Sequence, residues 1–264
     1  MLPDYISRAV PVPRDKRAPW YVNTAPSYAG VFLWVAFYQS LAEGTISRAG
    51  VGVCMLALAV AGLLSWALYY YAPAMLGMKT GYTLYVVGSS TFGTRGGYLM
   101  PGILMGLLQV GWFAVSTFYS TTYILKGFRS DAQAGSPLFI LVAVLWGCMM
   151  GYIGVKGIRY VARVALYLNL IAFLMVLLVF LQTSGGVSRY TPMDPHPDPW
   201  KAFTLVIQLV IGFFATAGAA GADFGMNNRN EKDVRWGGFL GIAVAVLYAG
   251  GLPLMSVIRL EDPD

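Results

Sequence analysis

The chain has 264 residues, of which 57% are hydrophobic and only 11% are charged, and its formal net charge is +6. Soluble domains usually carry about 25% charged residues, so this composition excludes an ordinary soluble domain and predicts an all-α integral membrane protein. Nucleic-acid binding is not expected, because the positive charge records an asymmetry between two sides of a membrane rather than a basic patch interleaved with aromatic residues.

Long stretches without acidic or basic residues recur seven times, and each exceeds the ~20 residues that a helix needs to cross the hydrocarbon core. We therefore predict a cytoplasmic segment at 1–26, one transmembrane bundle at 27–258 and an extracytoplasmic end at 259–264. The predicted spans are approximately 27–47, 50–76, 98–125, 136–155, 160–182, 202–222 and 236–258.

Basic residues are distributed unequally between the two sides of this bundle. Twelve of the 18 lie before the first span or in loops predicted on the same side: Arg8, Arg14, Lys16, Arg17, Lys79, Arg95, Lys156, Arg159, Arg163, Arg229, Lys232 and Arg235. The positive-inside rule therefore predicts a multi-pass protein of the cytoplasmic membrane with its N-terminus in the cytoplasm.

The first predicted span places Gln39 and Glu43 on one helical face. The amide of Gln39 suits the edge of a planar heterocyclic amide, or alternatively an interhelical hydrogen bond that only ties helices together. Glu43 is a candidate coupling residue, because a carboxylate in the membrane is costly unless it is paired or wetted. The alternative places Glu43 near the outer end of the helix, beside Arg48.

The third predicted span carries a stripe of residues at helical spacing that includes Trp112 and Ser116. Trp112 follows Gly111 and lies in the middle of the span, which argues against a lipid-interface anchor. A flat aromatic ring inside a bundle, with a hydroxyl group one turn on, suits stacking of a planar ligand. An aromatic stripe that only packs between helices is the simpler alternative.

The sixth predicted span contains small residues that allow either tight helix packing or an unwound turn. These are Gly212, Thr216, Gly218 and Gly221. Phe213 and Phe214 flank this stripe, and either ring suits the second face of a planar ligand.

The first and sixth spans are thus both interrupted, five segments apart. Broken helices at corresponding places in two halves indicate a secondary transporter, because unwound backbone can face a substrate or an ion. The expected fold is a transporter bundle of inverted five-helix repeats, truncated here to seven transmembrane helices. The chain is then a fragment that lacks the later spans, or else a seven-span protein of another kind.

Metal chemistry is not expected. Asp194, His196 and Asp198 alternate with prolines in the longest outer loop, which a stiff, solvated segment explains better than a metal site. Cys54 and Cys148 both lie within predicted spans. We predict no metal and no cofactor.

Three motifs carry a family resemblance: Ser89–Gly93 followed by Pro101, Gly111–Val115, and Gly212–Thr216 followed by Ala222–Phe224. With them the chain resembles the nucleobase–cation symporter family, whose members carry purines, cytosine, hydantoins, allantoin or thiamine. The resemblance runs from about Trp20 over essentially the whole chain. It implies a five-plus-five inverted-repeat transporter coupled to Na⁺ or H⁺.

The resemblance also assigns roles to particular residues. The family's ring-stacking Trp matches Trp112, its polar contact one turn later matches Ser116, and its sixth-span aromatic matches Phe214. Its first-span Gln matches Gln39. The backbone carbonyls that bind the cation would fall at Val35 and Tyr38.

Two departures from the family pattern affect substrate identity. Ser89 stands where an Arg often precedes the Ser-Phe-Gly motif, and Ala220 replaces an Asn of the sixth-span motif. The Ala-Asp-Phe ending of that motif at Ala222–Phe224 points toward the cytosine and purine branch.

Together these features predict a permease that imports a nucleobase or related planar N-heterocycle by cation-coupled alternating access. Trp112 with Phe213 or Phe214 would stack on the ring, while Gln39 and Ser116 would read its polar edge. The alternative is a seven-span sensor or receptor without transport activity, whose N-terminus would normally lie outside. An enzyme is not expected, because no predicted span holds paired carboxylates or a histidine cluster.

Overall fold

A computed structural model describes residues 3–33, 35–42, 44–187, 190–192, 194 and 196–261. Within these residues the ordered structure is helical, apart from one isolated parallel bridge between Ala18 and Asn228. Six helices are long and apolar enough to cross a membrane: Ile46–Thr80, Ser89–Gly127, Pro137–Val155, Ile158–Thr183, Pro199–Ala219 and Glu231–Ile258. They support a multi-pass membrane protein.

Three of these helices are composite, because a short π-helical turn joins two α-helical parts. The parts are α4 (Ile46–Leu64), η4 (Ser65–Tyr70) and α5 (Tyr71–Thr80); α7 (Ser89–Gly97), η5 (Tyr98–Leu104) and α8 (Met105–Gly127); and α13 (Glu231–Gly238), η7 (Phe239–Val244) and α14 (Ala245–Glu261). Pro101 lies inside η5, where the wider turn accommodates a residue that has no N–H to donate.

The other long helices are α9 (Pro137–Val155), α10 (Ile158–Thr183) and α11 (Pro199–Ala219). Side chains cap the start of α9 and α11, whereas Gly157 precedes α10 without a side-chain hydrogen bond. Ser136 Oγ accepts from Phe139 N at 3.3 Å before α9, and Asp198 Oδ1 accepts from Lys201 N at 2.9 Å before α11. A proline follows each cap at the first helical position, where its missing N–H has no cost.

The first predicted span, 27–47, is broken into short pieces. These are α2 (Thr24–Ala29), the 3-10 turn η3 (Gly30–Phe32) and α3 (Val35–Ala42). The chain leaves helical geometry at Leu33, with φ −85° and ψ 62°. An interruption is confirmed: the chain leaves helical geometry near Leu33, and again after Ala42, where α3 ends and Gly44 has a φ of 72°. No piece can cross a membrane alone, so six spanning helices are described where seven are predicted.

The sixth predicted span, 202–222, is continuous where the sequence predicts a break. Helix α11 runs without interruption to Ala219, and only Ala220 separates it from α12 (Gly221–Gly225). The prediction of a break in the middle of this span is therefore wrong. The small residues instead allow close packing: a Cβ on Gly218 would lie 2.8 Å from Tyr69 Cβ, which no ordinary contact permits.

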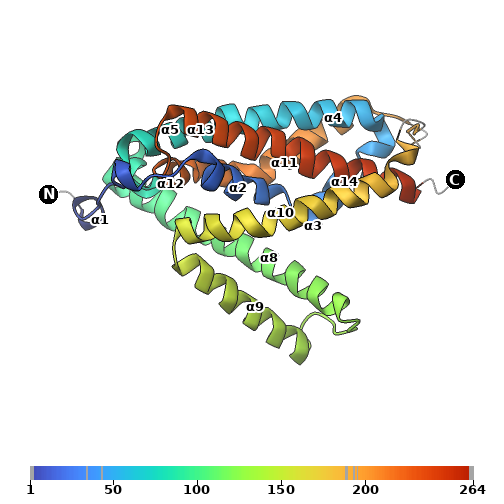
Figure 1. The fold of residues 1–264 in the computed structure, drawn as a ribbon, viewed down its shortest axis with the longest axis horizontal. Helices are drawn as coiled ribbons and strands as arrows, with labels where there is room; N and C mark the ends of the chain where they lie inside the picture. Colours follow the sequence, from blue (N-terminus) through green and yellow to red (C-terminus); the bar gives the residue numbers. More distant parts are fainter. Residues whose placement is uncertain are drawn as a thin grey trace.

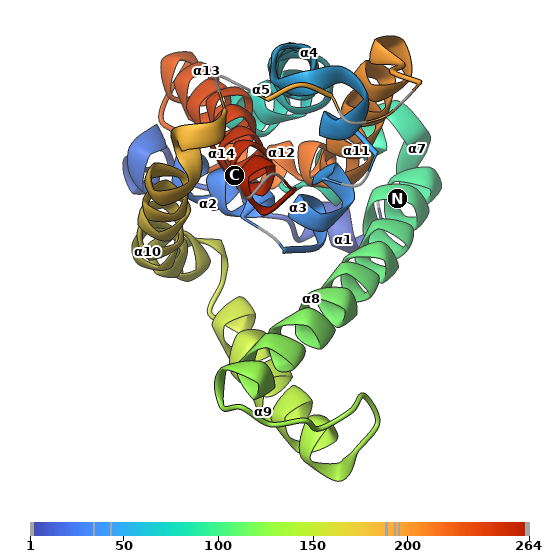
Figure 2. The same ribbon diagram turned by 90° about the vertical axis from the view of Figure 1, so that its right-hand side faces the viewer.

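The helices form a compact bundle with an arm of two helices beside it (Figure 1). The core lies where the first segment, α4, α11 and α14 meet, and its largest buried side chains include Tyr28, Phe32, Phe37 and Phe214. Helices α8 and α9 extend away from this bundle (Figure 2). We call the end that carries α1 (Asp4–Ser7) and the start of α10 the N-terminal end of the bundle.

Burial differs sharply between the bundle and the helices around it. In the most apolar window of Glu231–Ile258, 61% of residues are buried inside the protein, whereas none is buried in the corresponding windows of Ser89–Gly127, α9 and α10. Leu, Ile, Val and Met side chains on these helices face outward. Such surfaces are stable against hydrocarbon, which fits helices that face lipid.

Candidate functional site

A cavity of ~280 Å³ lies beside the break in the first segment. It is formed by three elements: the η3 turn, α8 and α11. Its lining residues are Gly30, Val31, Leu33, Gln109, Trp112, Ser116, Phe213, Thr216 and Ala217. The volume is at the small end of the ~300–1,000 Å³ range usual for ligand pockets, so it suits a small molecule of one or two rings.

Two aromatic rings from different helices meet in this cavity. Trp112 of α8 and Phe213 of α11 have ring centroids 5.7 Å apart at an interplanar angle of 37°. A flat guest between two parallel rings needs ~7 Å between them, twice the van der Waals contact distance. The rings therefore touch each other as they lie, and a sandwiched guest requires them to move apart. Figure 2 shows that α8, which carries Trp112, lies at the edge of the bundle.

Polar groups border the same cavity. Gln109, Trp112 and Ser116 follow one another at intervals of three and four residues, so they share one face of α8. Thr216 adds a hydroxyl group from α11. An amide and two hydroxyl groups around a pair of rings can hydrogen-bond the edge of a planar molecule while the rings cover its faces.

Gln109 is the lining residue that the sequence interpretation missed. Its position three residues before Trp112 on the same helical face was the available signal. The predicted stripe steps by four residues through Trp112 and Ser116, a spacing that passes over this amide. Its Nε2 lies 3.9 Å from Met105 Sδ, a weak contact.

A second cavity, of ~460 Å³, continues from the first toward the N-terminal end of the bundle. The two share Val31, Gln109 and Ala217, and the second reaches Asp223. Asp223 Oδ1 accepts from Leu84 N at 2.9 Å. This residue follows the end of the α11 span; burial raises the pKa of its carboxyl group, and the hydrogen bond from Leu84 acts in the opposite direction.

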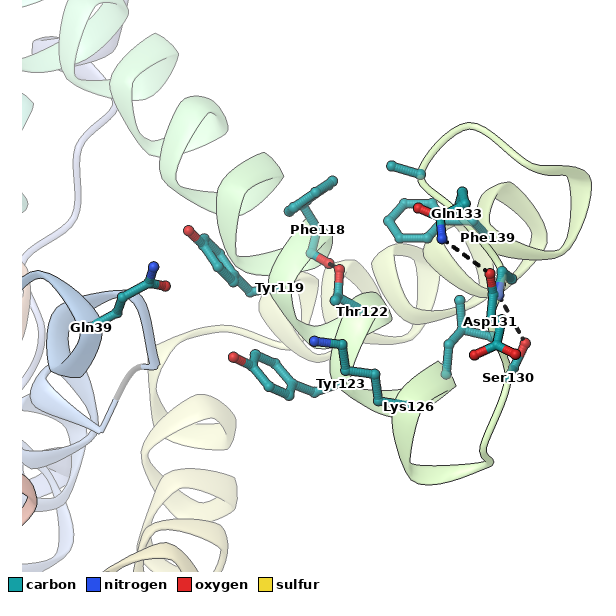
Figure 3. Close-up of a pocket in the computed structure, with 13 residues that line it drawn as sticks. Gln39, Phe118, Tyr119, Thr122, Tyr123, Lys126, Ser130, Asp131, Gln133 and Phe139 are labelled. Atoms are coloured by element: carbon teal, nitrogen blue, oxygen red, sulfur yellow. Dashed lines mark hydrogen bonds between the residues drawn. The ribbon is translucent and has the colours of Figure 1, made fainter. Parts of the chain in front are cut away.

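Gln39 lies in a different cavity from Trp112. That cavity has a volume of ~460 Å³ and is bordered by α3, the last turns of α8 and the loop before α9. Figure 3 shows Gln39 on one side and the hydroxyl groups of Tyr119 and Tyr123 on the other, with Lys126 nearby. The structure therefore does not bring the amide of Gln39 to the ring pair of Trp112 and Phe213.

Phe214 points into the core and away from the cavity. Its side chain is fully buried and stacks on Phe32, with centroids 5.9 Å apart and an interplanar angle of 15°. Successive helical residues project about 100° apart, so Phe213 and Phe214 cannot both face α8. Of the two aromatic candidates, the structure places only Phe213 beside Trp112.

The predicted cation-site residues follow the break in the first segment. Val35 is the first residue of α3 and Tyr38 lies one turn later. Glu43, the coupling candidate, lies outside the described residues. This segment lies beside the cavity, and cation binding by the carbonyl groups of Val35 and Tyr38 stays a prediction.

The carboxylates of the loop before α11 have structural partners. Asp194 forms an ion pair with Arg48, with Oδ2 3.2 Å from Nε, and its Oδ1 accepts from His196 N at 2.9 Å. Asp198 caps α11. In the part of the chain that the structure describes, no three His, Cys, Asp or Glu side chains gather where they could hold a metal ion.

Comparison with known proteins identifies related sequences. A family described as permeases for cytosine/purines, uracil, thiamine and allantoin matches residues 11–258. The cytosine permeases of Escherichia coli O157:H7 and of Escherichia coli strain K12 are each 29% identical to this chain over 162 residues. That region is 60% of this chain but only 36% of either relative. The relatives are transporters, and nothing in these comparisons supports a sensor or receptor.

Proposed function

The chain belongs to the family of permeases for cytosine/purines, uracil, thiamine and allantoin, and we propose that it imports a nucleobase or a related planar N-heterocycle across the cytoplasmic membrane. Cytosine, purines, hydantoin and allantoin are the candidate substrates. The single observation that supports this proposal most directly is the cavity that joins Trp112, Phe213, Ser116 and Gln109 beside a broken membrane segment.

The substrate ring lies against Trp112 and Phe213 in this proposal. Gln109, Ser116 and Thr216 then face its polar edge, because all three line the same cavity. A heterocycle with adjacent N–H and C=O groups matches an amide and hydroxyl groups, which both donate and accept. Gln39 contacts the substrate before it reaches these rings, in the separate cavity between α3 and the last turns of α8 that Gln39 shares with Tyr119.

Transport would proceed by alternating access in an inverted five-helix-repeat bundle, with the N-terminus in the cytoplasm. The broken first segment supports this, since non-helical backbone at membrane depth is tolerated only where it is buried or lines a cavity. A co-transported Na⁺ would bind at the carbonyls of Val35 and Tyr38, whereas a co-transported H⁺ would need a titratable group, for which Glu43 is the coupling candidate. Bound cation would raise substrate affinity by ~1–3 kcal/mol, the usual range for such coupling.

Counterflow in proteoliposomes tests this function. Vesicles that contain the purified protein and unlabelled cytosine should accumulate external radiolabelled cytosine, and excess purine, hydantoin or allantoin should reveal by competition which ring is preferred. Thermal stabilisation of the purified protein by the same compounds tests the site without a complete transport cycle. Failure of every compound both to exchange and to stabilise would refute the proposal.

Replacing Gln109 tests the polar half of the site. We expect Gln109→Ala to weaken substrate affinity by about 3- to 10-fold, because one hydrogen bond contributes ~0.5–1.5 kcal/mol net. The measurement is the half-saturating concentration for stabilisation and for uptake. Leu108→Ala is the matched control, since Leu108 precedes Gln109 on α8, is 46% exposed and borders neither cavity. Equal affinities in the two variants would contradict the role of Gln109.

A further inference from the structure

A third cavity, of ~350 Å³, lies at the N-terminal end of the bundle and has a different chemical character. Three of its lining residues are basic: Lys16 in the N-terminal segment, and Arg159 and Arg163 in the first turns of α10. None of its lining residues is acidic, although Asp15 is the neighbour of Lys16 in the sequence. The cavity is therefore a concentration of positive charge in a concave surface.

The three basic side chains have no ion-pair partner among the described residues. The ion pairs there engage Arg8, Arg48, Arg229 and Arg235, and neither Lys16 nor the two α10 arginines. A single exposed arginine without a partner is ordinary, because water solvates it. Convergence of three on one cavity is less ordinary, because like charges repel and the repulsion is relieved by a bound anion.

The geometry of α10 strengthens this positive field. Arg159 and Arg163 are four residues apart, a spacing at which like charges on a helix destabilise each other by a few tenths of a kcal/mol. They also lie in the first turns of a 26-residue helix, where the helix dipole disfavours cations and favours anions. Tyr167 continues the same face and is 67% exposed, as expected of an aromatic side chain at the edge of the membrane.

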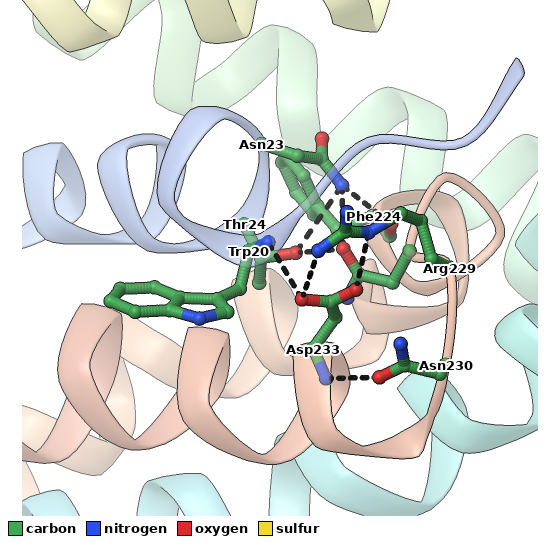
Figure 4. Close-up of polar contacts among 8 residues, drawn as sticks. Trp20, Asn23, Thr24, Phe224, Arg229, Asn230 and Asp233 are labelled. Atoms are coloured by element: carbon green, nitrogen blue, oxygen red, sulfur yellow. Dashed lines mark hydrogen bonds and ion pairs between the residues drawn. The ribbon is translucent and has the colours of Figure 1, made fainter.

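The opposite wall of the cavity is held firmly by a polar network (Figure 4). Asn23 Nδ2 donates to Phe224 O at 3.1 Å and to Asn228 Oδ1 at 2.8 Å. Ala18 N donates to Asn227 O at 2.8 Å. Beside them the buried carboxylate of Asp233 pairs with Arg229, with Oδ2 2.9 Å from Nε, and accepts from Trp20 N at 3.2 Å. The network fixes the N-terminal segment opposite α10, so the cavity is preformed.

We propose that this cavity binds the phosphate group of an anionic ligand at the inner face of the membrane. Arginine and lysine side chains are the usual partners of phosphate oxygens, and basic pockets between membrane helices on the cytoplasmic side bind anionic lipid headgroups. A lipid headgroup and a soluble phosphate share this chemistry. Exposed Leu166 and Tyr167 beside the arginines fit the lipid source, because they offer apolar surface next to the charge.

A bound phosphate would connect two elements that are otherwise joined by few polar contacts. Asn169 Nδ2 donates to Pro26 O at 2.6 Å, and it links α10 to the first segment further along the helix. The anion would add a second link, between Arg159 or Arg163 and Lys16, at the end of the bundle. Anionic lipid is then expected to stabilise the protein as well as to bind it.

The test compares phosphatidylglycerol, phosphatidylcholine with the same acyl chains, and inorganic phosphate at matched ionic strength. The unfolding temperature of the purified protein in non-ionic detergent is measured as each is titrated. Phosphatidylglycerol should stabilise at lower concentration than phosphatidylcholine. Arg159→Gln/Arg163→Gln should weaken its apparent affinity by about 30-fold, as expected for two basic groups at an anionic surface.

The control variant Arg95→Gln/Lys232→Gln removes the same charge from exposed positions that do not border this cavity, and it should keep the affinity of the parent protein. The unfolding temperature of each variant without additive checks its fold, and Lys16→Gln provides a second, milder variant. Stabilisation by inorganic phosphate alone, lost in the arginine variant, would assign the site to a soluble anion. The proposal is overturned if phosphatidylglycerol binds the arginine variant as tightly as the parent, or if neither anion binds.

Discussion

Substrate uptake at low concentration should be strongly reduced in Trp112→Ala while the protein still folds and inserts into the membrane. The indole ring is the largest side chain that lines the proposed substrate cavity, and its centroid lies 5.7 Å from that of Phe213. Stacking of a base on an aromatic side chain contributes ~1–3 kcal/mol, so the apparent affinity should fall by about 5- to 150-fold. Uptake of labelled cytosine at concentrations near the half-saturating value measures the effect.

The folding half of this prediction follows from the place of α8 in the structure. Trp112 lies on a helix at the edge of the bundle and outside the buried core cluster, so its truncation removes ligand contact rather than core packing. Phe113→Ala is the matched control, because the next side chain on α8 is also aromatic but borders a separate cavity beside α9. Trp112→Phe should retain part of the uptake. Normal transport by Trp112→Ala would refute the stacking role.

The sequence predicts that Trp112 and Ser116 share a site on α8, and the structure places both in one cavity. A Trp in the middle of an apolar span cannot serve as an interface anchor, and Ser116 one turn later shares its face. Gln109, three residues before Trp112, lies on the same face but not on a stripe that steps by four residues toward the N-terminus. The spacing of three that also defines a helical face therefore predicts this amide.

The choice between Phe213 and Phe214 could not be made from the sequence. Both residues are Phe and both are surrounded by apolar residues along the helix. The sequence pattern therefore does not say which of the two rings faces a ligand. The core decides: Phe214 stacks on Phe32 and contacts Tyr28, at centroid distances of 5.9 and 5.7 Å. These partners come from a segment almost two hundred residues away, which local sequence does not specify.

The sequence also could not predict where the first segment breaks, again because distant packing decides it. Gln39 marked the segment as unusual, but it lies inside α3 and not at the break near Leu33. Gly30, three residues before Leu33, keeps helical dihedral angles and does not itself end the helix. Phe32 and Phe37 on the two sides of the break are both fully buried, and tertiary packing of this kind overrides local helix propensity.

Glycine residues at the crossing of α5 and α12 are expected to be essential for stability. Helices α5 and α12 cross at backbone contact: a Cβ added to Gly77 would lie 2.1 Å from Ala222 O, and one added to Gly225 would lie 2.1 Å from Ala74 O. Real Cβ atoms do not approach a carbonyl oxygen so closely, and no side-chain rotamer can relieve a clash between two backbones. We therefore expect Gly225→Ala to destabilise the protein by ~3 kcal/mol or more, the upper end of overpacking costs.

Unfolding temperature and the yield of monodisperse protein in detergent measure this effect, and Gly77→Ala should reproduce it from the other helix. Gly212→Ala is the matched control, since a Cβ there meets nothing within 4 Å; it should leave stability unchanged or raise it by up to ~1 kcal/mol through helix propensity. The crossing also holds Asp223, between Ala222 and Gly225, where its carboxylate accepts from Leu84 N. If Gly225→Ala were as stable as Gly212→Ala, α5 and α12 would not cross at backbone contact, and the wall of the second cavity would need to be rebuilt.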